Sequence, residues 1–318
     1  MAGEPPPPFA WLVLAGAVLA VSSAGAVFQL IDEIDPMLRA SWRLQGTALL
    51  LFPPFLYQLN KFKKSSPESF SRLKNKGVIG AIFGSGICLG IHFGSWVWSL
   101  DNTSLTHSLL FVTAHPLVIV TGLYLMGKAI NSKQAIGATI GFIGVGVTLL
   151  GVTNESDVSL IGDLAAFVGA VAIVGYWAAG RVLRGWMPLF IYAFPVTLIA
   201  SILLSFSSLI LEGGNIGLIP PETSVFGWSD MVWLPAIAYL AFVPGIIGHT
   251  GINGVLRWFP PIFISVSVLF EPLLGSLIGW LLGTTGVPGI YTWVGGPFLI
   301  TGIILVTIGQ NESEVNEL

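Results

Sequence analysis

Residues 105–126 read LTHSLLFVTAHPLVIVTGLYLM, and residues 261–282 read PIFISVSVLFEPLLGSLIGWLL. Both stretches are almost wholly apolar, and Glu271 is the single acidic residue in the pair. A helix needs about 20 mostly apolar residues to cross a bilayer, because lipid cannot satisfy exposed backbone N–H and C=O groups. Both stretches therefore predict membrane-spanning helices, and each has a proline at its centre, Pro116 or Pro272.

Eight further stretches have the same character: 10–31, 38–59, 77–99, 135–153, 162–183, 188–210, 231–255 and 290–309. The 318 residues are 54% hydrophobic and only 9% charged, whereas a soluble domain carries about 25% charged residues. We therefore predict an all-α integral membrane protein with ten transmembrane helices and the lipid bilayer as its surroundings. The stretch 10–31 is too long for a signal peptide, so we expect it to remain in the mature protein as the first membrane helix.

The loops between these stretches carry an asymmetric charge. With the N-terminus inside, 11 of the 13 Lys and Arg residues fall in inner loops, and the other two are Arg39 and Arg43. The outer loops are acidic or neutral. This bias follows the positive-inside rule and predicts that both termini lie on the inner side. No basic face with interleaved aromatic residues indicates a nucleic-acid partner. The pattern does not identify which membrane holds the protein.

The chain repeats itself at an offset of about 156 residues. Pro116 matches Pro272, Gly127 matches Gly283, and further glycines align in the same order: Gly137, Gly144 and Gly151 with Gly295, Gly302 and Gly309. Two halves of five helices follow, at 10–155 and 156–309, between a tail at 1–9 and a tail at 310–318. Because five is odd, the second half enters from the opposite side, which predicts an inverted-topology repeat of the kind found in secondary transporters.

Several short motifs then resemble the EamA-type branch of the drug/metabolite transporter superfamily. The run Val268-Leu269-Phe270-Glu271-Pro272 resembles its "EP" signature, the opening Arg39-Ala40-Ser41-Trp42-Arg43 resembles the arginine that begins its second helix, and residues 137–151 resemble its glycine-rich fifth helix. The resemblance implies a five-plus-five bundle whose central cavity is lined mainly by helices other than five and ten. It also implies transport of small metabolites, with amino acids among several substrate types.

The sequence departs from that family at three places. Lys128 and Thr284 stand where an acidic residue often follows the fourth helix of a half, and His115 stands where glutamate or a neutral residue is usual. These departures leave the subfamily and the substrate open.

Glu271 and His115 are the ionisable residues that we expect near the middle of the membrane. A charge at mid-helix costs about 2.5–3.5 kcal/mol on insertion scales, so such a residue needs a reason. Pro272 and Pro116 follow them, and because proline lacks an N–H we expect a kink or hinge at each. A Glu–His pair there predicts a substrate or proton site; the alternative is that both residues only fix helix packing.

Six other residues are candidates for substrate binding on the same grounds. His92 and Trp96 are four residues apart, as are His249 and Asn253, so each pair shares a helix face that we expect to point into the bundle. Tyr176 and Trp177 offer aromatic surfaces. For each of the six, packing is the alternative role.

Arg43 can hold an anionic solute. It lies one to two turns from the outer face, however, so extension of its side chain to water is an equal alternative.

Glycines four residues apart predict close helix packing. They are Gly80 and Gly84; Gly86, Gly90 and Gly94; Gly137 and Gly141; and Gly275, Gly279 and Gly283.

The pattern as a whole favours a secondary transporter of a small organic solute, driven by protons, another ion or the solute gradient. No metal or cofactor motif is present, and Cys88 is the single cysteine. The alternatives are a channel, a non-transporting scaffold and, last, an intramembrane enzyme with Ser85 as nucleophile and His92 or His115 as base. Glycosylation at the sequons Asn102 and Asn154 stays open, as does the oligomeric state.

Overall fold

The computed structural model describes residues 6–127, 129–150, 157–256, 258–259, 264 and 267–316. Lys128, Gly151 and Asn154, named above, lie outside these residues. The described chain is helical, apart from one isolated bridge between Asn215 and Ser224. The first half contains α1 (Pro8–Ser22), α2 (Ala24–Gln29), α3 (Pro36–Ser65), α4 (Pro67–Ser71), η1 (Arg72–Lys74), α5 (Lys76–Leu100), α6 (Leu105–Val112), α7 (His115–Leu125) and α8 (Ser132–Leu149).

The second half begins with two long helices, α9 (Leu160–Arg184) and α10 (Leu189–Leu211). It continues with η3 (Pro221–Thr223), η4 (Gly227–Ser229), α11 (Leu234–Leu240), the π-helix η5 (Ala241–Thr250), α12 (Gly251–Val255), α14 (Glu271–Leu282) and α15 (Ile290–Asn316). Each predicted span overlaps a helix, but the bounds differ by several residues, because apolar composition does not encode how far a helix extends beyond the lipid.

Seven helical segments of the described chain are long and apolar enough to cross a membrane. They are Pro8–Gln29, Lys76–Leu100, Leu105–Leu125, Leu160–Arg184, Leu189–Leu211, Leu234–Val255 and Ile290–Gly309. Three other helices are outside this set for different reasons. The 30-residue α3 carries charged residues, α8 has a polar first turn, and α14 is only 12 residues long.

Side-chain caps explain where several helices begin. The side chains of Asn75, Ser104 and Ser159 accept hydrogen bonds from the first turns of α5, α6 and α9. Asn131 and Gln134 form a reciprocal capping box at the start of α8. These caps satisfy backbone N–H groups that a helix start leaves without a partner.

The predicted proline kinks are instead breaks between helices. α6 ends at Val112, and Pro116 stands in the first turn of α7. Pro272 likewise stands in the first turn of α14, which begins at Glu271. A proline is tolerated in the first turn because the N–H it lacks has no helical partner there. The structure thus interrupts the helix just before each proline, and a role of the prolines as hinges stays a prediction.

The two half-helices α7 and α14 resemble each other at both ends. Each begins with an ionisable residue followed by proline, and each is followed by a glycine in the left-handed region, Gly127 at φ 70° and Gly283 at φ 73°. Glycine alone adopts this conformation without a steric penalty. The two glycines are the pair that the sequence repeat aligns.

Close packing through glycine is clearest between α8 and α15. A Cβ atom added at Gly144 would lie 2.3 Å from the Leu299 backbone nitrogen, and one at Gly302 would lie 2.3 Å from the Gly141 nitrogen. The prediction of glycine-mediated packing was wrong for Gly80 and Gly84, since nothing lies within 4 Å of a Cβ at either position.

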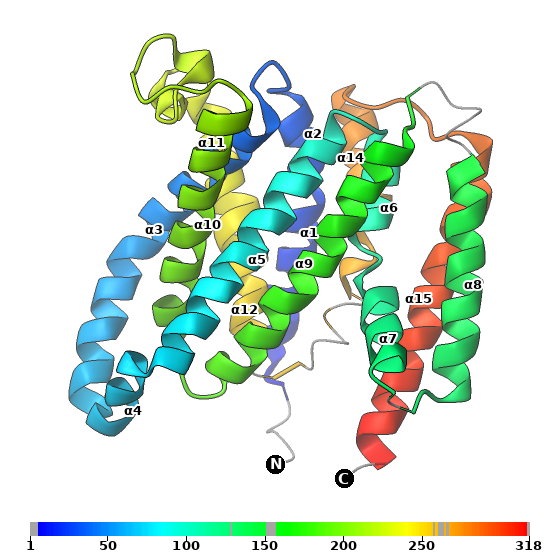
Figure 1. The fold of residues 1–318 in the computed structure, drawn as a ribbon, viewed down its shortest axis with the longest axis horizontal. Helices are drawn as coiled ribbons and strands as arrows, with labels where there is room; N and C mark the ends of the chain where they lie inside the picture. Colours follow the sequence, from blue (N-terminus) through cyan, green and yellow to red (C-terminus); the bar gives the residue numbers. More distant parts are fainter. Residues whose placement is uncertain are drawn as a thin grey trace.

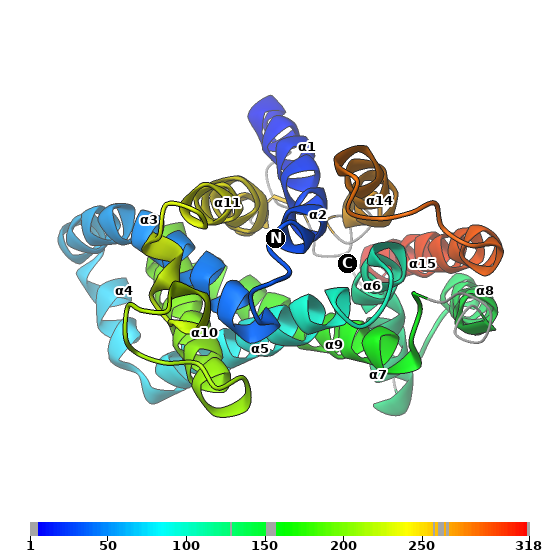
Figure 2. The same ribbon diagram turned by 90° about the horizontal axis from the view of Figure 1, so that it is seen from above.

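The arrangement places α8 and α15 together at one flank and α3 with α10 at the other, while α5 and α9 pack side by side between them (Figure 1, Figure 2). α1 starts and α15 ends at the same end of the bundle, where α4 also lies. The middle of the bundle is therefore surrounded by α1, α3, α5, α9, the π-helix and the half-helices.

Candidate functional site

Two small cavities lie next to each other inside the bundle, and His249 lines both of them. We call the first the His92 cavity; it has a volume of about 30 Å³ and is lined by Val21, Ala24, His92, Trp96, Val112, Thr113, His115, Ile173, Trp177, His249, Ile252, Val268 and Glu271. We call the second the Arg43 cavity; it has a volume of about 20 Å³ and is lined by Arg43, Leu44, Thr47, Leu89, Phe93, Tyr176, Ala193, Thr197, Gly245, His249, Thr250 and Asn253.

The cavities bring together the residues that the sequence singled out. Five of the nine predicted binding or coupling residues line the His92 cavity alone, three line the Arg43 cavity alone, and His249 lines both. The lining residues come from both halves of the chain, and none comes from α8 or α15. That agrees with what the resemblance implied about the fifth and tenth helices. The roles of the nine residues in binding stay a prediction.

Glu271 and His115 occupy equivalent places in the two halves. Each is the first residue of a half-helix, and each side chain is buried, at 8% and 2% exposure. The N-terminus of a helix carries a partial positive charge that favours a nearby anion. Glu271 is thus an acid that stands at the N-terminus of α14 and lines the cavity.

Histidine and aromatic rings form the wall of the His92 cavity. The His92 and Trp96 rings stack at 6.2 Å with an interplanar angle of 18°, which confirms that they share a face. His249 lies 6.2 Å from His92 between ring centroids, and the His115 and Trp177 rings are 4.7 Å apart. Nδ1 of His92 donates to the Gly169 carbonyl at 2.9 Å. That bond orients the ring and leaves Nε2 for the cavity.

Arg43 is buried in α3 and does not extend to water, so the alternative of a surface-reaching side chain was wrong. Its side chain is 1% exposed, and its Cζ atom lies 4.3 Å from the ring centroid of Phe93 and 5.6 Å from that of Phe28. Nε, Nη1 and Nη2 have no hydrogen-bond partner among the described residues. An electrostatic interaction links Arg43 with Glu271, but no salt bridge within 4.0 Å joins these two described residues.

Tyrosine and asparagine side chains complete the far wall of the Arg43 cavity. Asn253 donates to the Tyr176 hydroxyl and, at 2.9 Å, to the His249 carbonyl. The Tyr192 hydroxyl donates to the Tyr176 carbonyl at 3.2 Å and lies 2.7 Å from the Ser85 hydroxyl. Ser85 is therefore hydrogen-bonded to a tyrosine hydroxyl.

The π-helix explains how His249 and Asn253 reach the cavities. It runs from Ala241 to Thr250 and contains Pro244, which has no N–H to donate. A π segment shifts the side chains that follow it around the helix axis and is frequent at functional sites. Sequence reasoning placed the two residues on one face but did not predict this geometry.

A buried polar cluster at the end of the bundle opposite the N-terminus was missed (Figure 1). Nδ1 of His107 lies 3.0 Å from Asp163, Nε2 of His107 lies 2.9 Å from the Thr292 hydroxyl, and Thr103 donates to Asp163 at 2.7 Å. His107 and Asp163 are 0% and 1% exposed. The available signal was two ionisable residues near the starts of the predicted spans 105–126 and 162–183. The cluster ties α6 and α9 to the first turn of α15.

Charged side chains are also paired where α3 begins and α5 ends. Arg39, at the start of α3, forms a salt bridge with Asp101. Burial raises the pKa of the Asp101 carboxyl above its usual range, and the Arg39 guanidinium acts in the opposite direction. Near the sequon residue Asn102, whose side chain donates to the Trp98 carbonyl, the chain is thus held close to the bundle.

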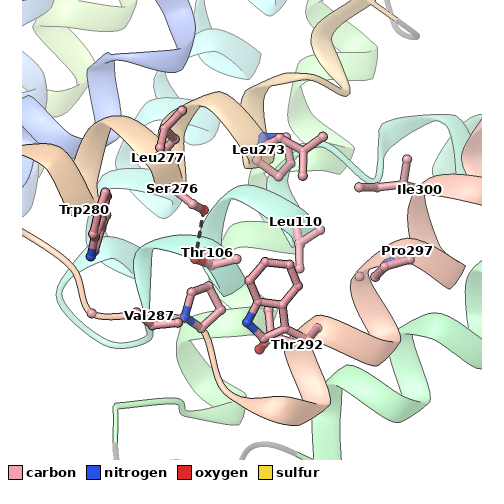
Figure 3. A pocket seen from close by; sticks show the side chains of 15 residues that line it. Thr106, Leu110, Leu273, Ser276, Leu277, Trp280, Val287, Thr292, Pro297 and Ile300 are labelled. Atoms are coloured by element: carbon pink, nitrogen blue, oxygen red, sulfur yellow. Dashed lines mark hydrogen bonds between the residues drawn. The ribbon is translucent and has the colours of Figure 1, made fainter.

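Two larger hollows lack the predicted binding residues. One, of about 330 Å³, lies between α6, α14 and α15; Figure 3 shows Leu110, Leu273, Trp280 and Ile300 around it and the 2.8 Å contact of Thr106 with Ser276. The other, of about 560 Å³, lies between α3 and α10. Neither has a charged lining residue, and both are bordered by exposed apolar side chains. These are features of a surface that faces lipid.

The comparisons with known proteins agree with this architecture. Residues 8–150 match the EamA-like transporter family. No curated protein matches the chain. One crystal structure of a protein is 20% identical, with a TM-score of 0.61, over 95% of this chain and 98% of that chain. At this identity the likeness shows the fold alone, and it extends over both halves.

Proposed function

From the match of residues 8–150 to the EamA-like transporter family, a branch of the drug/metabolite transporter superfamily, we propose that the chain is a secondary transporter of a small organic solute, such as an amino acid or a related metabolite. It is a multi-pass integral membrane protein with seven long apolar helices among its described residues. We propose further that α3, α8 and the segment ending in α14 also cross the membrane, giving ten spans in two inverted halves with both termini inside.

One observation carries the proposal. Nine ionisable, amide and aromatic side chains from both halves line two adjoining cavities inside an otherwise apolar bundle. Ionisable groups at such depth are costly and usually mark a solute or ion path. Half-helices that begin beside the cavities fit the discontinuous helices of secondary transporters, whose ends help to bind solutes and coupling ions.

The size of the cavities favours alternating access over a channel. About 30 Å³ and 20 Å³ leave room for a water molecule or two in each. An organic solute fits only if the halves move apart, and a channel would need a continuous path. The breaks before α7 and α14, where Pro116 and Pro272 stand, are the proposed hinges. No described feature supports the scaffold or enzyme alternatives.

Uptake by purified protein in liposomes tests the function. A mixed metabolite library is offered outside, and uptake is measured by mass spectrometry for the wild type and for Glu271→Gln at two internal pH values. We expect a subset of solutes to enter. In the wild type their uptake depends on pH, and in E271Q this dependence is lost because the acid that titrates is gone.

Two other results have distinct meanings. Equal uptake and equal pH dependence in both proteins keep the transporter and make Glu271 structural. No solute moving, with protein shown to be folded by its thermal unfolding curve, rejects the transport function.

A further inference from the structure

Arg43 is a buried cation that requires an anionic partner. It is the eighth residue of α3, it lines the Arg43 cavity, and none of its guanidinium nitrogens has a hydrogen-bond partner among the described residues. A buried charge without a partner costs several kcal/mol. The contacts with Phe93 and Phe28 return about 2 kcal/mol or more each in a desolvated site, but ring faces leave the N–H donors of the guanidinium without hydrogen-bond acceptors. Packing alone therefore does not account for an arginine at this position.

The chemistry of the guanidinium narrows the class of partner. It presents five N–H donors in a planar fork and no acceptor, which matches the two oxygens of a carboxylate. Two other buried polar atoms of the cavities also have no partner in the described chain, the indole nitrogen of Trp96 and Oδ1 of Asn253. The indole N–H adds a donor toward the His92 cavity. The amide oxygen adds one acceptor for an N–H or O–H group of the same ligand.

Charge balance then involves Glu271. Arg43 and Glu271 interact electrostatically, and when Glu271 is ionised their two charges sum to zero. A carboxylate arriving at Arg43 would leave one net negative charge in a low-dielectric interior. One proton on Glu271 removes it. The other titratable groups that face Glu271 across the cavity are His92, His115 and His249.

The helices packed against α14 add little to this balance. α1 and α2 carry no charged side chain, and His107 of α6 is already bonded to Asp163 and Thr292.

Resting on the proposed transport function, we propose that the solute carries a carboxylate that binds Arg43, and that each carboxylate crosses the membrane together with one proton held on Glu271. Both partners are released on the far side, so the cycle moves no net charge. Arg43 is then shared in turn between Glu271 and the solute.

The solute class is tested with matched probes in the liposome assay. Each carboxylate that the wild type takes up from the library is offered beside its carboxamide and its methyl ester. We expect the carboxylate alone to enter, and we expect Arg43→Gln to lower its uptake at least tenfold. Lys63→Gln, at an exposed position on the same helix, serves as the control and keeps wild-type uptake. Solutes without a carboxylate entering, and carboxylates excluded, would overturn the proposal.

Thermal unfolding separates a binding role from a structural one. Because the buried guanidinium of Arg43 makes no hydrogen bond to a described residue, Arg43→Met is expected to unfold at the wild-type temperature or higher while its carboxylate uptake is lost. A clear fall in unfolding temperature, with unchanged uptake per folded molecule, would make Arg43 structural.

Proton coupling is tested by measuring which gradient drives accumulation of the carboxylate. An inward proton gradient should accumulate the carboxylate in the wild type, and a membrane potential set with potassium and valinomycin should have no effect. Glu271→Gln mimics the protonated acid, so we expect it to retain exchange of labelled for unlabelled carboxylate and to lose gradient-driven accumulation. Accumulation that follows the potential and ignores the pH gradient contradicts the one-proton coupling. Absence of all uptake in the wild type rejects the transport function itself, which is a different result.

Discussion

At the scale of single residues, burial without a partner separates binding side chains from structural ones. The guanidinium nitrogens of Arg43 have no hydrogen-bond partner in the described chain, whereas Asp163 accepts a hydrogen bond from Thr103 and pairs with His107. Both residues are at most 1% exposed. We therefore interpret the hydrogen-bonded His107–Asp163 cluster as one that holds helices together, and Arg43 as a residue that binds a ligand.

The His107 cluster gives the first prediction. His107→Ala leaves the Asp163 carboxylate buried with Thr103 alone, and breaking a buried pair this way costs about 3–5 kcal/mol. The double variant His107→Ala/Asp163→Asn removes the unpaired charge and should be more stable than His107→Ala by itself. Thermal unfolding in detergent micelles measures both. If the double variant is instead the less stable, Asp163 is not charged in the folded protein.

Glu212 gives a pH prediction outside the membrane-spanning segments. Its carboxylate accepts from the Met37 N–H at 2.7 Å and the Leu38 N–H at 3.1 Å in the first turn of α3. Burial raises its pKa, and the hydrogen bond from Met37 opposes this. A raised folded-state pKa means that the folded protein holds the proton more tightly. The resulting stability is fully present below the unfolded pKa of about 4.3 and is lost as pH rises through the folded value.

The measurement compares the wild type with Glu212→Gln, so that pH effects of all other groups cancel. The unfolding temperature of the wild type relative to E212Q should be higher at pH 4 than at pH 8. A difference that does not change with pH contradicts the raised pKa.

At the scale of elements, the α8–α15 pair behaves as a rigid flank. Gly137, Gly141 and Gly144 lie against the backbone or side chains of other helices. Such contact lets two helix backbones approach closely and gains dispersion energy along their length. Neither helix lines a central cavity, so we interpret the pair as a support against which the other helices move.

A matched pair of substitutions tests this packing. A Cβ at Gly144 would lie 2.3 Å from the Leu299 nitrogen, whereas a Cβ at Gly146 on the same helix meets nothing within 4 Å. Both changes to alanine gain about 1 kcal/mol in helix propensity. We expect G146A to unfold at or above the wild-type temperature, and G144A to lose about 1–3 kcal/mol through overpacking. Equal stabilities in thermal unfolding would show that the two helices separate freely.

Hydrophobic runs and polar exceptions could be predicted from the sequence, and side-chain partners could not. Glu271 and His115 were identifiable because a mid-span ionisable residue before proline is rare and has a physical cost. Whether the Arg43 side chain reaches water or turns inward depends on its contacts with the Phe93 and Phe28 rings. These contacts could not be predicted, because nothing in the sequence distinguishes the two phenylalanines from the other apolar residues of the spans. The π-helix could not be predicted from the hydrophobic pattern either, because its wider turns leave the apolar composition of the segment unchanged.

At the scale of the whole molecule, the number of crossings fixes the orientation of every loop. Composition alone selects seven spans in the described chain, and an odd number would put the two termini on opposite sides. The structure brings the start of α1 and the end of α15 to the same end of the bundle (Figure 1). That arrangement needs an even number, which ten spans supply. Seven spans and ten spans predict different membrane sides for particular loops.

Cysteine labelling distinguishes them. The background is Cys88→Ala. Single cysteines then replace Lys63 in the last turn of α3, Leu218 before η3, and Val287 between α14 and α15. All three positions are exposed. Ten spans put Lys63 on one side and both Leu218 and Val287 on the other. Seven spans put Lys63 and Leu218 together and Val287 opposite. A membrane-impermeant maleimide, added to sealed vesicles before and after permeabilisation, reports the side of each cysteine. The two counts differ in the side of Leu218 relative to Lys63 and Val287, so the labelling of Leu218 decides between them. We expect Lys63 to be protected wherever Leu218 and Val287 are labelled, because only an even count closes the chain back on the end from which α1 starts.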